Sequence, residues 1–129
     1  MKRLQLFEFG DQEWLPGAWR RYITEYLQFM LVHGPFDGLS GLVSRVCREG
    51  EPTIDLCSGS GGPWGAYLQE PMPEFEQTTV VLTDLRPNEE ALERIEEETN
   101  GRASPHGQPV DATDVPAELR GPRTITKAL

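Results

Sequence analysis

Hydrophobic side chains recur at helical spacing in the first part of the chain. The segment begins around Pro16, and its apolar residues are separated by steps of three and four positions, at Leu15, Trp19, Tyr22, Ile23, Tyr26, Leu27, Met30 and Leu31. This spacing predicts an amphipathic helix that ends at Gly34-Pro35, because glycine favours a helix C-cap and proline cannot continue the helix. We expect the stripe to pack into the core, with a lid over a ligand as the alternative.

A second helical segment and two strands follow. Asp37 is a suitable N-cap for the apolar positions of residues 39–47, and Gly50 ends that segment. Residues 53–56, Thr-Ile-Asp-Leu, form a short β-type run that leads directly into a cluster of glycines. Residues 78–83 give the strongest strand pattern of the chain, and so apolar a run is typical of a strand covered on both faces.

Helices are expected between and after these strands. Residues 64–70 are expected to form a short helix, and Asn88 is expected to cap a longer one whose first turn holds two glutamates. Farther on, Val110-Asp111 is at best an edge strand, and residues 115–119 indicate one helical turn. Helices that alternate with strands imply a parallel sheet with right-handed crossovers, so we predict an α/β fold.

Charge divides the chain into two parts. The 129 residues carry a net charge of −9, and all of it falls on residues 51–129, since residues 1–50 hold six acids and six bases. We therefore expect residues 1–50 to be an N-terminal helical extension and residues 51–129 to be the ligand-binding part. An acidic balance of this size argues against a broad nucleic-acid-binding face.

Other sequence features narrow the class of protein. No apolar run reaches the roughly 18–20 residues of a membrane-spanning helix, and no signal-peptide core follows the first residues, so we expect a cytoplasmic chain without membrane contact. Cys47 and Cys57 are too few for a disulfide framework, and with only two histidines we expect no metal site. Cys47 is expected to be a small buried hydrophobic residue.

The glycine cluster after residues 53–56 is the most informative stretch. It places an acid at the end of a strand and glycines two positions apart, in the run Asp-Leu-Cys-Ser-Gly-Ser-Gly of residues 55–61. A dinucleotide-binding fingerprint requires a small residue at position 64, where Trp64 stands, which leaves a nicotinamide-dependent oxidoreductase only a weak alternative. A phosphate-binding P-loop requires a lysine, and there is none between Lys2 and Lys127.

Residues 54–61 resemble the first motif of the Rossmann-like S-adenosylmethionine-dependent methyltransferases. That motif reads hydrophobic, Asp or Glu, any residue, Gly, Ala or Cys, any residue, Gly, any residue, Gly, and this chain matches it position by position. The resemblance implies that Asp55 and the loop backbone hold the methionine part of the cofactor. Cys57 stands where the family more often has glycine.

The resemblance also implies two later contacts. Asp84 ends the second strand, where the family has an acid that accepts hydrogen bonds from the ribose hydroxyls, and Leu85 is expected to lie against the adenine. Asp111 and Ala112 match the third motif, which reads the adenine edge. Taken singly, Asp55 is open to interpretation as a helix-capping or turn residue, Asp84 as a turn acid, and Asp111 or Asp114 as a surface cap.

The predicted function is therefore methyl transfer from S-adenosylmethionine to an unidentified acceptor. The expected cofactor-binding residues are Asp55, Cys57, Ser58, Gly59, Gly61, Asp84, Leu85, Asp111 and Ala112. The expected fold is an incomplete Rossmann-like parallel sheet of about three strands with two leading helices. Aromatic residues of the first helix are open to a second role, as a cover over the acceptor.

The resemblance covers about residues 36–120, and full-length relatives continue through further strands. We therefore expect the chain to be truncated before the acceptor site, and we nominate no catalytic base. The strand that pairs with the other side of residues 53–56 is expected to be missing, with residues 123–127 at most its beginning. An open edge favours a homo-oligomer, and an inactive nucleotide-binding or protein-interaction module is the alternative function.

Overall fold

The chain builds one parallel sheet. The computed structural model describes residues 14, 16–33, 39–47, 50–69, 73–120 and 124–127. Four strands run in the order β3-β2-β1-β4: β1 (Thr53–Leu56), β2 (Val80–Leu82), β3 (Ala103–Pro105) and β4 (Thr124–Lys127). Parallel neighbours require long crossovers, and helices α3 (Trp64–Gln69) and α4 (Glu89–Glu98) lie in the first two. The predicted α/β class is therefore confirmed.

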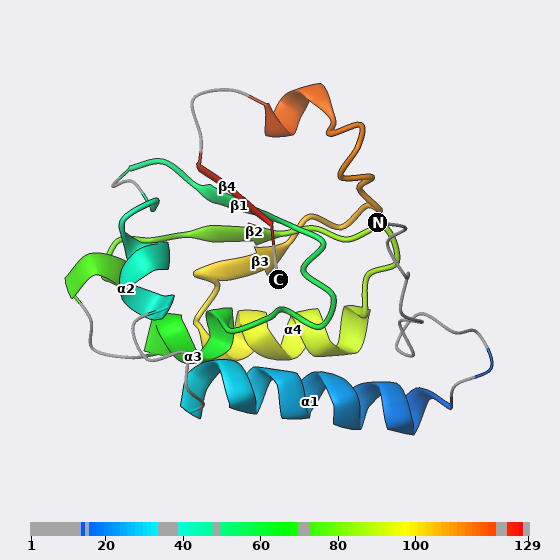
Figure 1. Ribbon diagram of the computed structural model, residues 1–129. Coiled ribbons are helices and arrows are strands. Elements are labelled where there is room, and N and C mark those ends of the chain that lie inside the picture. Colours follow the sequence, from blue (N-terminus) through cyan, green and yellow to red (C-terminus); the bar gives the residue numbers. More distant parts are fainter. Residues whose placement is uncertain are drawn as a thin grey trace, which may run out of the picture.

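Helices cover one face of the sheet and an irregular segment covers the other (Figure 1). Helices α3 and α4 lie directly below the strands in this view, and α1 (Gly17–His33) forms a further layer outside them. The segment that contains the 3-10 turn η3 (Ala117–Leu119) lies on the opposite side, and a second 3-10 turn, η2 (Pro73–Phe75), precedes β2. The predicted helical turn at 115–119 is thus present in shorter form.

The core consists of two apolar clusters, one on each face of the sheet. The first cluster joins the sheet to α3 and α4 and includes Trp64, Tyr67, Leu68, Phe75, Val80, Leu82, Leu92, Ile95 and Ala103. The second joins Ile54 and Leu56 of β1 to Val110 and Leu119, with Val81 packed against it. Successive β2 residues therefore enter opposite clusters, which confirms the prediction of a strand covered on both faces.

The predicted first helix is present as α1, but its aromatic stripe does not enter the core. Trp19, Tyr22 and Tyr26 are each about 60% exposed, whereas Ile23 and Met30 are half-buried. The prediction of core packing is therefore wrong for these three aromatic residues, because α1 lies outside α3 and α4 rather than against the sheet. The side chains of Leu15, Leu27 and Leu31 lie outside the described residues. Neither α1 nor any other helix of the described ranges is long and apolar enough to cross a membrane.

The second helix, α2 (Leu39–Ser44), is shorter than predicted, and its expected cap Asp37 lies outside the described residues. The chain turns after it, because the amides of Val46 and Cys47 both donate to the carbonyl of Val43. Cys47 is half-buried and packs against the first cluster. Burial raises the pKa of its thiol, and a hydrogen bond with Thr53 opposes this effect.

The third strand lies at β3 rather than at the predicted Val110-Asp111. Pro105 ends β3, and because β3 is an edge strand the missing amide of proline is tolerated there. Val110 is buried, but it owes this to packing on the second cluster rather than to a place in the sheet. An apolar residue in a covering loop and one in a strand look alike in so short a run, which explains the error.

The predicted open edge of β1 is also wrong. β4 pairs in parallel with β1 from Thr53↔Thr124 to Leu56↔Lys127, so the edges of the sheet belong to β3 and β4. The strand expected to be missing is thus present as residues 124–127, which were predicted at most to begin it.

Candidate functional site

The carboxyl ends of β1, β2 and β3 gather at one edge of the sheet. The chain adds β2 and β3 on one side of β1 and then crosses to β4 on the other side. In open α/β sheets, ligands bind outside the carboxyl ends of the strands where the strand order reverses in this way. The residues that follow β1 and β2 therefore lie where a ligand site is expected in such a sheet.

Asp55 lies inside β1 and is 1% exposed. It is neither a helix cap nor a turn residue, so that alternative interpretation is wrong. Leu56 after it pairs with β4, and Cys57 then adopts a φ of +59°, which turns the chain back toward β2. A positive φ is easy for glycine and costly for other residues, which gives a physical reason why glycine suits this position.

The glycine loop, residues 57–62, passes close to α4. Gly61 has a φ of +97°, and a Cβ added there would lie 2.0 Å from Ile95 Cδ1, so a residue with a side chain would be strained in its backbone and would force Ile95 to shift. Trp64 begins α3 and is buried in the first cluster, edge-to-face with Tyr67. The indole therefore points into the core, and the close approach to α4 is made by Gly61 and Gly65 instead.

Asp84 joins the glycine loop to the turn after β2. Its Oδ2 accepts a hydrogen bond of 2.8 Å from the Gly59 amide, and its Oδ1 accepts one of 2.8 Å from the Arg86 amide. The second bond is that of a turn acid, as the alternative interpretation predicted, and the first connects residues 25 positions apart. A carboxylate offers about four acceptor positions, so Asp84 keeps capacity for two further donors.

Asn88 connects the same loop to α4. Its Oδ1 accepts from the Ala91 amide, which confirms the predicted N-cap, and its Nδ2 donates to Ser60 Oγ over 3.3 Å. The glycine loop is thus bonded both to the turn after β2 and to the start of α4. These two contacts hold the loop at the sheet edge.

A cleft of about 630 Å³ lies beside Asp84. It is bounded by the turn after β2, the first half of α4 and the loop after β3, with Leu85, Pro87, Leu92, His106 and Gln108 in its walls. Leu85 is 57% exposed and lines this cleft. The consecutive residues Asp84 and Leu85, which the resemblance assigns to ribose and adenine, thus line the cleft, whereas the predicted site residues of the glycine loop do not.

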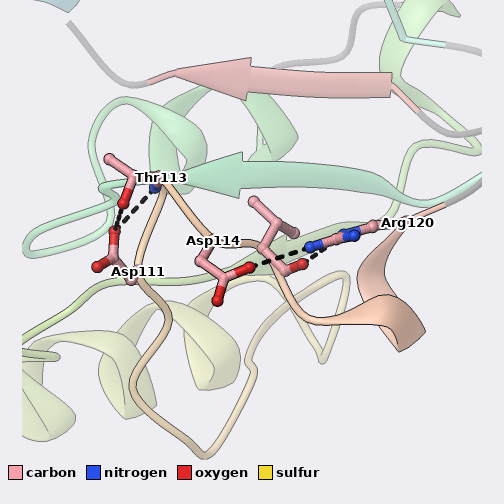
Figure 2. Close-up of polar contacts among 5 residues, drawn as sticks. Asp111, Thr113, Asp114 and Arg120 are labelled. Carbon is pink, nitrogen blue, oxygen red and sulfur yellow. Dashed lines mark hydrogen bonds and ion pairs between the residues drawn. The ribbon is translucent and has the colours of Figure 1, made fainter.

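The third motif lies elsewhere. Asp111 Oδ1 accepts from both the amide (2.8 Å) and the hydroxyl (2.6 Å) of Thr113, and Asp114 forms an ion pair with Arg120 (Figure 2). Hydrogen bonds from Thr113 lower the pKa of Asp111, and the hydroxyl contributes more than the amide. Asp111 is therefore an exposed turn acid that caps the Thr113 amide, and the next helical turn begins only at Ala117. Ala112 packs against the second cluster, and among the described residues neither it nor Asp111 lines the cleft.

Two structural residues were missed by the sequence analysis. Thr83 bonds to both Asp55 and Ser58, and only its place between a strand and an acid could have drawn attention to it. Arg102 donates to the carbonyls of Leu68, Thr78 and Phe75, and thereby ties α3 and η2 to the start of β2. A lone arginine between a helix and a strand carries no pattern that predicts such bonds.

Comparisons with family models, with curated proteins and with solved structures gave no match for this chain.

Proposed function

We propose that this chain binds S-adenosylmethionine at the carboxyl edge of β1 and β2, as the cofactor-binding part of a Rossmann-like methyltransferase. The observation that carries the proposal is the 2.8 Å hydrogen bond from the Gly59 amide to Asp84. It joins the two motifs that the resemblance assigns to the methionine and ribose parts of one cofactor. Two such motifs in contact are expected of one continuous site.

The strand order supports the proposal. Doubly wound nucleotide-binding sheets have the order 3-2-1-4-5-6, and β3-β2-β1-β4 is the first four-strand part of that order. The glycine loop lies at the end of the central strand β1, beside the point where the order reverses. A ligand that spans β1 and β2 would therefore lie in the usual place for such sheets.

The residues present fit the adenosine part of the cofactor. The remaining acceptor capacity of Asp84 suits two adjacent hydroxyls, and the exposed Leu85 offers an apolar surface for a base. The contacts of Asp111 with Thr113 give it a local structural role, so the proposal leaves the recognition of the adenine edge to other groups.

The proposed chemistry is methyl transfer. When bound, the cofactor would supply a methyl group from its sulfonium to a nucleophilic atom of the acceptor, leaving the neutral thioether. The glycine loop and Asp84 would contribute by orientation, because holding donor and acceptor in line lowers the entropic cost of the reaction. We assign no catalytic residue and no acceptor.

The test is calorimetric titration of the chain with S-adenosylmethionine and with its demethylated product. We expect saturable binding of both. Asp84→Asn should weaken it about 10- to 100-fold, since hydrogen bonds to a charged group contribute roughly 1.5–3 kcal/mol. Asp114→Asn is the control, because Asp114 is also a loop acid that accepts hydrogen bonds but bonds Arg120 rather than the glycine loop.

Two results would overturn the proposal. One is the absence of saturable binding by a chain whose circular dichroism and cooperative unfolding show that it is folded. The other is equal binding by Asp84→Asn and Asp114→Asn, which would place the ligand away from the end of β2.

The exposed aromatic side chains of α1 favour a second candidate, a protein-interaction module. Trp19, Tyr22 and Tyr26 lie on one side of a helix and expose about 60% of their surface. Exposed aromatic patches on a soluble domain often mark interaction sites. Sedimentation velocity over a hundredfold range of concentration tests self-association, and a monomer at every concentration counts against a second copy of this chain as the partner.

A further inference from the structure

β1 leaves β2 at the point where the site begins. The register pairs Asp55 with Leu82, but the next residue, Leu56, pairs with Lys127 of β4. Cys57 then turns the chain back, and the amide of Ser58 donates to the carbonyl of Thr83 over 2.8 Å. In a regular parallel ladder the Cys57 amide would make this bond, so β1 carries one extra residue here and the ladder is interrupted by a bulge.

A compact set of hydrogen bonds spans this bulge. Three donors converge on the carbonyl of Asp55: the Ser58 hydroxyl (3.0 Å), the Thr83 hydroxyl (2.8 Å) and the Thr83 amide (3.0 Å). The Ser58 hydroxyl oxygen also accepts from the Thr83 amide over 3.0 Å. Ser58 is 3% exposed and Thr83 2%, so water has little access to these bonds.

The next residue on each side carries a group that faces the proposed ligand. Gly59 follows Ser58 and Asp84 follows Thr83, and these two residues make the contact between the loop and the acid. Moving Ser58 away from Thr83 would therefore separate the Gly59 amide from the Asp84 carboxylate. The buried contact between Ser58 and Thr83 and the site contact between Gly59 and Asp84 are therefore made by neighbouring residues on both segments.

We propose that Ser58 and Thr83 are positioning residues, whose hydroxyls set the distance between the glycine loop and Asp84. The inference rests on the proposed function for its consequence in ligand binding, but not for its consequence in loop order. Neither hydroxyl needs to touch the ligand. Hydroxyls are suited to this task because they can donate and accept. Ser58 Oγ donates to the Asp55 carbonyl and accepts from the Thr83 amide, and the Thr83 hydroxyl adds a further donor to the same carbonyl.

The test compares two buried threonines. Thr83→Val removes the hydroxyl with little change of shape. Thr99→Val is the matched control, because Thr99 is 3% exposed and its hydroxyl donates to the Ile95 carbonyl over 2.7 Å at the opposite end of α4. Hydrogen exchange of residues 57–62 is measured in both variants and normalised to that of residues 80–82 of β2. A third variant, Thr83→Ser, keeps the hydroxyl.

We expect exchange in residues 57–62 to rise about five- to tenfold in Thr83→Val, the fold-change that corresponds to loss of one hydrogen bond, and to stay within twofold of wild type in Thr99→Val and Thr83→Ser. Affinity for the demethylated cofactor should fall in Thr83→Val by a similar factor. Equal exchange in the two valine variants would overturn the inference. If the wild type binds no cofactor, the proposed function fails, while the exchange measurement still decides the positioning role.

Discussion

Substitution of Gly61 by alanine tests how closely the glycine loop approaches α4. Its φ is +97°, and a Cβ added there lies 2.0 Å from Ile95 Cδ1. A positive φ costs a residue with a side chain about 1–2 kcal/mol, and overpacking a core costs about 1–3 kcal/mol. Alanine restricts the unfolded chain and returns about 0.4–1 kcal/mol. We therefore expect Gly61→Ala to lower the free energy of unfolding by about 1–4.5 kcal/mol.

Two further variants separate the steric part from the backbone part. Gly62 has a φ of +53° with nothing within 4 Å of an added Cβ, so Gly62→Ala should cost only about 1 kcal/mol. Ile95→Val removes Cδ1 and leaves Cγ1 at 3.4 Å as the nearest of the Ile95 atoms. The double variant Gly61→Ala with Ile95→Val should therefore be more stable than additivity predicts by at least about 1 kcal/mol.

The assay is urea unfolding followed by far-ultraviolet circular dichroism, with the slope compared between variants to confirm a common transition. Equal losses in Gly61→Ala and Gly62→Ala would refute the steric argument. So would strict additivity in the double variant, because the clash with Cδ1 would then not be the cause of the loss.

Three other substitutions have defined outcomes. Cys57→Gly should raise the unfolding temperature by about 2–4 °C, because glycine adopts the φ of +59° without strain but loses more backbone entropy; an unchanged or lower temperature would contradict this. Arg102→Lys should lower the free energy of unfolding by about 2 kcal/mol in urea titration. The reason is that an ammonium group cannot reproduce the planar set of donors with which Arg102 reaches three carbonyls. A loss below about 0.5 kcal/mol would contradict this role of the guanidinium. Asp111→Asn should be less stable than wild type at pH 7, and the difference should shrink as the pH is lowered below 3.8, because a lowered pKa contributes stability above the ordinary value that is lost as the pH falls through the lowered one; a difference that does not change with pH would contradict the lowered pKa.

Features of the fold that depend on residues close together in the sequence could be predicted. Asn88 caps α4 through its own side chain, and residues 53–56 form β1 with the predicted bounds. The bond between Gly59 and Asp84 crosses 25 positions, and only the resemblance placed both residues in one site. The hydrogen bonds that Asp111 accepts from Thr113 are local too, and a surface role for Asp111 was available from the sequence.

The errors share a physical cause. Trp19 and Val110 have the apolar character of core or strand residues, but periodicity does not tell which surface a face will meet. α1 lies on the outer side of a helical layer (Figure 1), and Val110 packs in the second cluster without joining the sheet. The roles of the Ser58 and Thr83 hydroxyls could not be predicted either, because their hydrogen-bond partners are set by strand register rather than by neighbours in the sequence.

The central place of β1 has a consequence for biosynthesis. Its two neighbours come from opposite parts of the chain: β2 follows within 30 residues, whereas Thr53 and its partner Thr124 are 71 positions apart. During translation β1 therefore pairs first on one side only, and its other edge stays open until residues 124–127 have left the ribosome. An open parallel edge is prone to pairing with other chains, so we expect the nascent protein to depend on chaperones most during that interval.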